Sequence, residues 1–370
     1  MKDTVVSKSN IRQSGIELLK LLAMFLIVVS HTIQSIGQIS PDNPVYNNNV
    51  INLCDSTGNI QYLIMALIWN FVMYGVDVFF VSSAWFLSRK NSFKTDKLVK
   101  LLANTWTISV IFLLAYLLAG VHVSGKLIVK SLLPTLFANN WFVTCYIMLY
   151  VIHPLLNMIC DRAGRRVHGI IVISGMAYCI VTYVSEYLLF YSRLIIATII
   201  YISVCYLRKY MGDIADRKRL NAALFAGAFA ANVVIILLIN LAGSRYTFAN
   251  GLLMHTNVIQ NPFIILMAVT SFNIFRCMNL RSRTVNYLSS LTLFIYLIHE
   301  NILFRTYTKP EIWDSLLIKR GYENILGSCM LFSSVLFAVS VLLAALYDIS
   351  LNRLISSAVP LLNRFHPHRQ

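Results

Sequence analysis

Ionisable side chains interrupt apolar runs of this 370-residue chain that are long enough to span a lipid bilayer. The first run contains Glu17, Lys20 and His31, and a later run ends in His299 and Glu300. Histidine titrates near neutral pH, so it suits proton transfer to or from a hydroxyl group. A charged group at membrane depth costs several kcal/mol unless it is paired or hydrated. Each of these residues is therefore a candidate functional residue.

Helical spacing predicts how deep these residues lie. Glu17 and Lys20 are three positions apart, so they share one helix face and can pair. His31 lies fourteen positions after Glu17, which corresponds to about 21 Å along a helix. His299 lies fourteen positions after Val285, where its own span is expected to begin on the same side. The two histidines are thus expected at matched depth in the outer half of the membrane.

Three further charged residues extend this pattern into two polar clusters. Asp77, near the outer end of the second span, and Arg305, beyond Glu300, are expected at the depth of the two histidines. Arg208 ends a span on the inner side, as Lys20 begins one. A simpler role stays open for each residue: lysine and arginine near a boundary can extend to the interface, and a histidine can bond a carbonyl. His153, which precedes Pro154, is expected to bond a carbonyl that the proline frees.

Composition shows what kind of protein carries these residues. Hydrophobic residues make up 58% of the chain and charged residues only 12%, with a mean hydropathy of +0.68. These values exclude a soluble cytosolic enzyme, a disordered chain and a disulfide-rich secreted module. The net charge of +16 comes from short basic clusters between apolar runs, which is typical of membrane topology, so no nucleic-acid partner is expected.

The apolar runs predict an all-α, polytopic membrane bundle of about ten helices. The expected spans are 15–37, 66–88, 101–121, 141–159, 168–184, 192–207, 221–242, 258–276, 285–305 and 325–347. The stretch from Ile60 to Tyr74 is apolar and aromatic, and it could instead form an interfacial or re-entrant helix. With the N-terminus inside, 22 of the 31 Lys and Arg residues lie in inner segments, which predicts that both termini are cytoplasmic. The expected division is a tail (1–14), a membrane domain (15–347) and a second tail (348–370).

These patterns leave two function classes open, a transporter with a proton relay and an enzyme that works across the bilayer. Sequence motifs favour the second, because five segments in order resemble the acyltransferase 3 family of integral membrane enzymes. They are 16–31, with an acidic residue, a cation and a histidine; 75–87 (GVDVFFVSSAWFL); 141–157; 206–210 (YLRKY); and 296–301 (YLIHEN). Two positions depart from the family pattern: Lys20 replaces an arginine and Ala84 replaces a glycine.

The resemblance implies an O-acyltransferase, most often an O-acetyltransferase, that uses acetyl-CoA as co-substrate and a glycan hydroxyl as acceptor. It implies no tightly bound cofactor and no metal. Lys20 and Arg208 would attract the phosphates of CoA, which is cytosolic and polyanionic. The implied setting is the bacterial cytoplasmic membrane, with the lipid bilayer and the envelope-polysaccharide assembly machinery as further partners. A proton-coupled transporter or flippase, and a non-catalytic module of the same family, stay open as alternatives.

The resemblance also suggests roles for the candidate residues. His31 would act as the general base or as a transient acyl carrier. Asp77 or Glu300 would fix its tautomer, and Arg305 would stabilise an oxyanion or bind acidic glycan groups. Trp141 would stack on a sugar face. The implied catalytic set is Glu17, His31, Asp77, His299 and Glu300, and the implied substrate-binding set is Trp141, Asn301 and Arg305.

Overall fold

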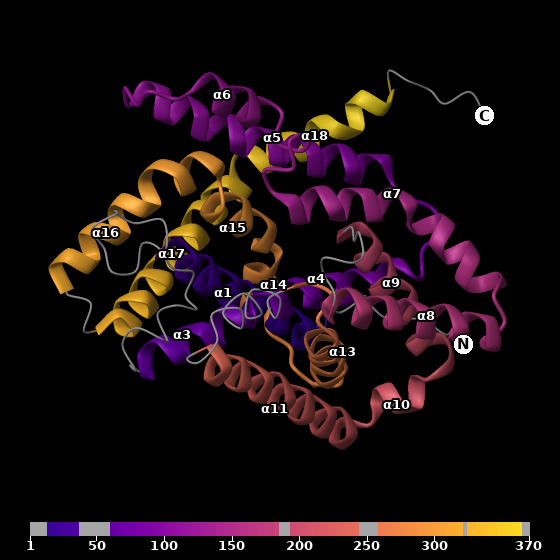
Figure 1. Cartoon of the computed structure of the whole chain (residues 1–370). Helices are drawn as coiled ribbons and strands as arrows, with labels where there is room; N and C mark the ends of the chain where they lie inside the picture. The colour runs from indigo at the N-terminus through magenta and orange to yellow at the C-terminus, as the bar shows by residue number, and fades with distance from the viewer. Residues whose placement is uncertain (1–12, 37–59, 185–192, 244–257, 321–323, 365–370) are drawn as a thin grey trace, which may run out of the picture.

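A computed structural model of the chain describes residues 13–36, 60–184, 193–243, 258–320 and 324–364. These residues form α-helices and one π-helix, with no strand among them (Figure 1). The first half comprises α1 (Ser14–Ile36), α3 (Ile60–Asn70), α4 (Val72–Leu87), α5 (Thr95–Leu118), α6 (Gly125–Leu132), α7 (Trp141–Arg162) and α8 (Arg165–Val184). The expected all-α bundle is confirmed.

The second half of the chain continues the bundle. It comprises α9 (Arg193–Tyr210), α10 (Gly212–Asp216), α11 (Lys218–Gly243), α13 (Pro262–Arg276), α14 (Arg283–Ser290), α15 (Thr292–His299), the π-helix η1 (Phe304–Thr308), α16 (Lys309–Arg320), α17 (Ile325–Ile349) and α18 (Leu351–Arg364). Seven helical segments of the described chain are long and apolar enough to cross a membrane. Large apolar side chains are exposed along α5, α8, α11 and α17, which is typical of surfaces that face lipid.

Each of the ten expected spans coincides with helical structure, but two of them are interrupted. The segment expected to cross as one helix over 285–305 is instead α14 followed by α15, with a break at Leu291 and an end at His299. The apolar stretch from Ile60 forms α3, which leads into α4 through the single residue Phe71. The number of crossings and their orientation stay predictions.

Helix α1 is the central element of the bundle (Figure 1). It packs against α3, α4, α13, α14, α15, α16 and α17. Its contact with α4 is close because Gly75 of α4 has no side chain: a Cβ atom there would lie 2.8 Å from both the Ala23 carbonyl oxygen and Ile27 Cγ1. This close approach holds the two helices that line the candidate site at a fixed separation.

Polar groups of the backbone are satisfied where helices begin or bend. Ser282 caps α14 by accepting from the Val285 N–H, and its own N–H donates to Ser14 Oγ at the start of α1. In α7, Pro154 lacks the N–H that would bond the Tyr150 carbonyl. His153 Nδ1 donates to that carbonyl at 2.5 Å, as expected from the sequence.

Replacing Gly75 by alanine tests the close contact between α1 and α4. We expect a loss of about 1–3 kcal/mol in unfolding free energy, because the added methyl group forces two packed backbones apart. Gly227→Ala in α11 is the matched control, since a Cβ atom there meets open space. Thermal unfolding in detergent measures both variants, and equal melting temperatures for the two would contradict the packing argument.

Candidate active site

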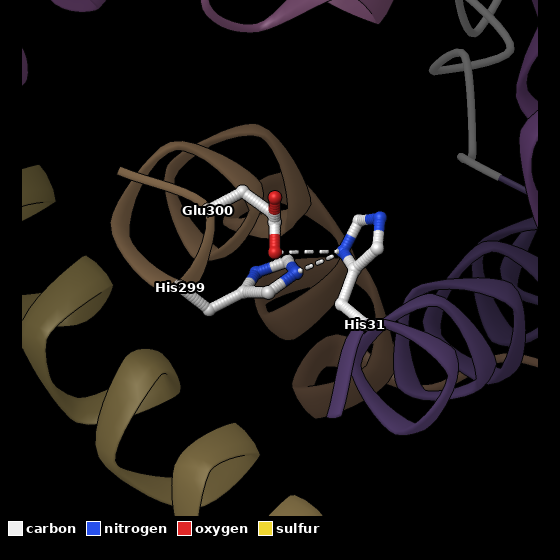
Figure 2. A group of neighbouring side chains, drawn as sticks. All are labelled: His31, His299 and Glu300. Atoms are coloured by element: carbon white, nitrogen blue, oxygen red, sulfur yellow. Dashed lines mark hydrogen bonds and ion pairs between the residues drawn. The ribbon is translucent and has the colours of Figure 1, made fainter. Parts of the chain in front are cut away.

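Two histidines and a glutamate from distant parts of the chain meet at the end of α15 (Figure 2). His31 Nδ1 of α1 lies 3.1 Å from His299 Nε2 and 3.2 Å from Glu300 Oε1. His299 is fully buried, and 18% of the His31 side chain is exposed. The expectation of matched depth for the two histidines is confirmed.

The hydrogen bonds define which nitrogen carries each proton. His299 Nδ1 lies 2.7 Å from the Ile295 carbonyl oxygen, which only accepts, so this nitrogen carries the proton. The Nε2 of neutral His299 is then an acceptor, and His31 Nδ1 must donate toward it and toward Glu300. The Nε2 of neutral His31 is left without a proton. In Figure 2 this second nitrogen points away from both partners. In this tautomer His31 Nε2 is able to accept a proton.

Glu300 is held in place by two cations. Its Oε2 accepts from Arg305 Nη1 at 3.2 Å, and its Oε1 lies 3.4 Å from Lys309 Nζ. Lys309 is fully buried and also donates to the His31 carbonyl oxygen at 2.9 Å. The pairing keeps Glu300 available to stabilise a positive charge on His31, because two cations favour its ionised form.

Lys309 is the functional candidate that the sequence analysis missed. It lies beyond the last residue of the expected span 285–305 and among polar residues, where a lysine normally faces water. The break after His299 brings it back: Glu300 and Asn301 leave the helix, and the π-helix η1 precedes Lys309. π-Helical turns are frequent at functional sites because they redirect side chains. A buried lysine nine positions after a glutamate has no helical-periodicity signal of its own.

Three cavities lie along α1. The basic cavity, of about 400 Å³, is lined by residues that include Lys20, Lys90, Lys97, Tyr146 and Tyr150. The small cavity, of about 30 Å³, is lined by residues that include Ile27, His31, Val72, Met73, Val76 and Trp141. The polar cavity, of about 400 Å³, is lined by His31, Gln34, Ser35, Glu300, Arg305, Thr306 and Pro310.

The basic cavity and the small cavity meet at a collar of four side chains. Met24, Phe79, Phe142 and Tyr296 line both of them. The rings of Phe79 and Tyr296 each lie with their centroids 5.9 Å from that of Phe142. On the other side, His31 is the residue shared by the small cavity and the polar cavity among those described. His31 thus borders the small cavity on one side and the polar cavity on the other.

The basic cavity has the charge expected of an anion site. Glu17 pairs with Lys20 at 3.0 Å, as expected, and also accepts from Ser289 Oγ. Partial burial, together with the charges of Lys97 and Lys94, lowers the pKa of Lys90. A polyanion in this cavity would relieve the repulsion among these lysines.

Comparison with known families agrees with this geometry. A family model for the acyltransferase domain matches residues 13–348. The chain belongs to the acyltransferase 3 family. Comparisons with curated proteins and with solved structures found no match. The matched range contains the His31–His299–Glu300 cluster and the three cavities, so the chain is a multi-pass membrane acyltransferase.

Arg208 and Asp77 are predicted site residues of this acyltransferase that contact neither its described cavities nor the cluster at His31. Arg208 donates to the Trp85 carbonyl oxygen and to Ser88 Oγ, on a side of α4 different from the residues that line the basic cavity. Asp77 is fully buried, and its carboxylate oxygens have no hydrogen-bond partner among the described residues. The structure brings Asp77 to neither His31 nor the described cavities, so it gives no contact through which Asp77 could fix the tautomer.

Two other predicted residues have local contacts that bear on their roles. Trp141 lines the small cavity, and the guanidinium of Arg193 lies 4.3 Å from the centroid of its ring. Asn301 is buried, and its Oδ1 accepts from the Leu303 N–H where the chain resumes a helix. This contact is a helix cap, which explains an asparagine at this position without a substrate.

The same cluster has the residue types of a metal site. His31, His299 and Glu300 offer three ligand atoms that all lie within 4.8 Å of one another. In this acyltransferase, however, Glu300 already contacts Lys309 and Arg305, and their charges oppose a bound cation. The donor set therefore fits proton transfer better than metal binding.

A double-mutant cycle on Lys309 and Glu300 tests whether this pair acts as a unit. We expect Lys309→Met and Glu300→Gln each to destabilise the protein by about 3–5 kcal/mol, because each leaves a buried charge with fewer partners. The double variant should lose at least about 1 kcal/mol less than the sum. Unfolding in mixed micelles, titrated with a denaturing detergent, measures these energies.

The control cycle is Arg276→Gln with Asp216→Asn. This pair is at 2.5 Å, but 63% of the Asp216 side chain is exposed, so its coupling should stay below about 1 kcal/mol. Additive effects at Lys309 and Glu300 would contradict a coupled pair.

Proposed function

We propose that this acyltransferase is an O-acetyltransferase of the bacterial cytoplasmic membrane. It moves the acetyl group of cytosolic acetyl-CoA to a hydroxyl of a cell-surface glycan or its lipid-linked precursor. The observation that carries the proposal is the position of His31. Its unprotonated nitrogen points away from its partners, and its side chain lines the two cavities that meet there.

The basic cavity is the proposed donor site. The lysines at its mouth suit the phosphates of CoA, and its aromatic wall suits the pantetheine arm. From Lys20 to His31 the rise along α1 is about 16 Å. A pantetheine arm extends on the order of 20 Å at ordinary bond lengths, so it is long enough to span this distance.

The polar cavity is the proposed acceptor site. In the reaction, His31 Nε2 takes the proton of the acceptor hydroxyl while the hydroxyl oxygen attacks the carbonyl carbon of the thioester. The carbon–oxygen bond forms, the carbon–sulfur bond breaks, and the proton passes from His31 to the departing thiolate to give CoA. Glu300 stabilises the imidazolium in between, and Arg305, which lines the polar cavity together with His31, offsets the negative charge that develops on the carbonyl oxygen.

A proton relay through Glu17, Asp77 and His31 would instead suit a transporter. Glu17 is about 21 Å from His31 along α1, and Asp77 lies outside the cavities that His31 lines. This separation does not favour a relay. Consumption of acetyl-CoA distinguishes the two functions, since a transporter consumes none.

Replacing His31 by alanine in the purified protein tests the proposal. We expect release of free CoA from acetyl-CoA to fall by about 10²–10⁴-fold, because the base is lost. The assay uses nanodiscs, radiolabelled acetyl-CoA and a membrane glycan extract. His122→Ala, an exposed histidine outside the described cavities, should retain wild-type release.

Two outcomes would count against the proposal. Release that persists in His31→Ala would leave an acyltransferase with a different base, and His299 would be tested next. Wild-type protein that neither binds acetyl-CoA nor releases CoA would reject the donor and direct attention to proton flux in liposomes.

Replacing Lys90 by alanine tests the donor site. We expect the KM for acetyl-CoA to rise by about tenfold with little change in kcat, since the charge contacts a remote part of the donor. Lys218→Ala is the control, because Lys218 is an exposed lysine at the start of α11 and lines none of the described cavities. A similar rise in both variants would indicate general electrostatic attraction and not a site at Lys90.

A further inference from the structure

The small cavity between the collar and His31 is close in size to an acetyl group. Its volume of about 30 Å³ holds two or three water-sized atoms. An acetyl group has three heavy atoms beyond the sulfur, namely the carbonyl carbon, its oxygen and the methyl carbon. The cavity therefore matches the transferred group and little more.

Branched apolar side chains of α1 and α4 form one wall of the cavity. Val72 and Val76 of α4 are buried, and their branched side chains have restricted rotamers. Ile27 is also buried and packs close to Gly75, in the tight contact between α1 and α4. Because close-packed side chains of this kind yield little, this wall cannot move back cheaply to admit a longer acyl chain.

The position of the cavity makes its size relevant to the donor. A thioester whose sulfur lies at the collar directs its acyl carbons into the small cavity, with its carbonyl close to His31. Each additional methylene would then have to enter the space occupied by Val72, Met73 or Val76. This step rests on the proposed function, since it assumes that the acyl donor enters from the basic cavity.

We propose that the small cavity selects the acyl group by length, and that Val76 and Met73 are its specificity-determining residues. Acetyl fits between the collar and His31, whereas propionyl and butyryl groups meet the α4 wall. The bonds that form and break are those of the proposed reaction, so selection requires no further reactant. The same residues leave the nucleotide part of the donor untouched.

The experiment compares kcat/KM for acetyl-CoA, propionyl-CoA and butyryl-CoA. In the wild type, the value should fall by at least about tenfold for the first added methylene, and again for the second. Val76→Ala should raise the propionyl-to-acetyl ratio by about tenfold, because it removes two methyl groups from the wall. Met73→Ala, at a half-buried position that tolerates truncation better, should shift the ratio in the same direction.

Val78→Ala is the matched control. The substitution removes the same two methyl groups as Val76→Ala, two residues farther along α4. Val78, however, lies in the core and lines none of the described cavities. It should leave the propionyl-to-acetyl ratio unchanged, even where stability falls. A ratio that moves equally in Val76→Ala and Val78→Ala would overturn the proposal.

Other outcomes separate this inference from the proposed function. Wild-type protein that uses butyryl-CoA as well as acetyl-CoA would reject length selection while keeping the acyltransferase reaction. Acetyl preference that survives both Val76→Ala and Met73→Ala would also reject these two residues. Absence of CoA release with every donor would reject the proposed donor site together with the inference.

Discussion

The candidate site depends on one buried carboxylate, that of Glu300. It contacts His31, Arg305 and Lys309, which reach it from different elements of the bundle. A lone charge at this depth would be expensive, and two cations without it would be more so. Glu300 therefore stabilises the groups around it and at the same time provides the counterion that a protonated His31 requires. Both the stability of the site and the proposed chemistry require a negative charge at Glu300.

The interruption of the helix at Glu300 allows this residue to contact both cations. In a continuous helix, the 3.6-residue period would fix the faces on which Glu300 and Arg305 lie. Lys309 would then lie two and a half turns beyond Glu300, on the opposite face of the helix. Ending α15 at His299 frees carbonyls of its last turn. The N–H groups of Glu300 and Asn301 donate to the carbonyls of Tyr296 and Ile298, and the Asn301 side chain caps the next helical turn. Irregular backbone is thus confined to a place where it is buried in protein and adjoins a cavity.

Sequence reasoning recovered the parts of the site that depend on helix period. The fourteen-residue spacing correctly placed His31 and His299 at matched depth, and the three-residue spacing correctly paired Glu17 with Lys20. It did not recover which face of α4 is turned toward the cavities, because that depends on how the helix is rotated about its axis. Asp77 shares α4 with Val76, yet one step of about 100° turns it away from the cavities. Lys309 was missed because a break in the helix, which leaves no periodic signal, brings it back to His31.

The register of α1 connects the separate features of the molecule. Lys20, Met24, Ile27 and His31 follow one another at steps of three or four residues, so they lie on one helix face. In that order they line the basic cavity, the collar, the small cavity and the junction with the polar cavity. A single rigid helix thus sets the distance between Lys20 at one end and His31 at the other. Since Gly75 fixes how closely α4 approaches this face, the width of the path is set by the packing that stabilises the bundle.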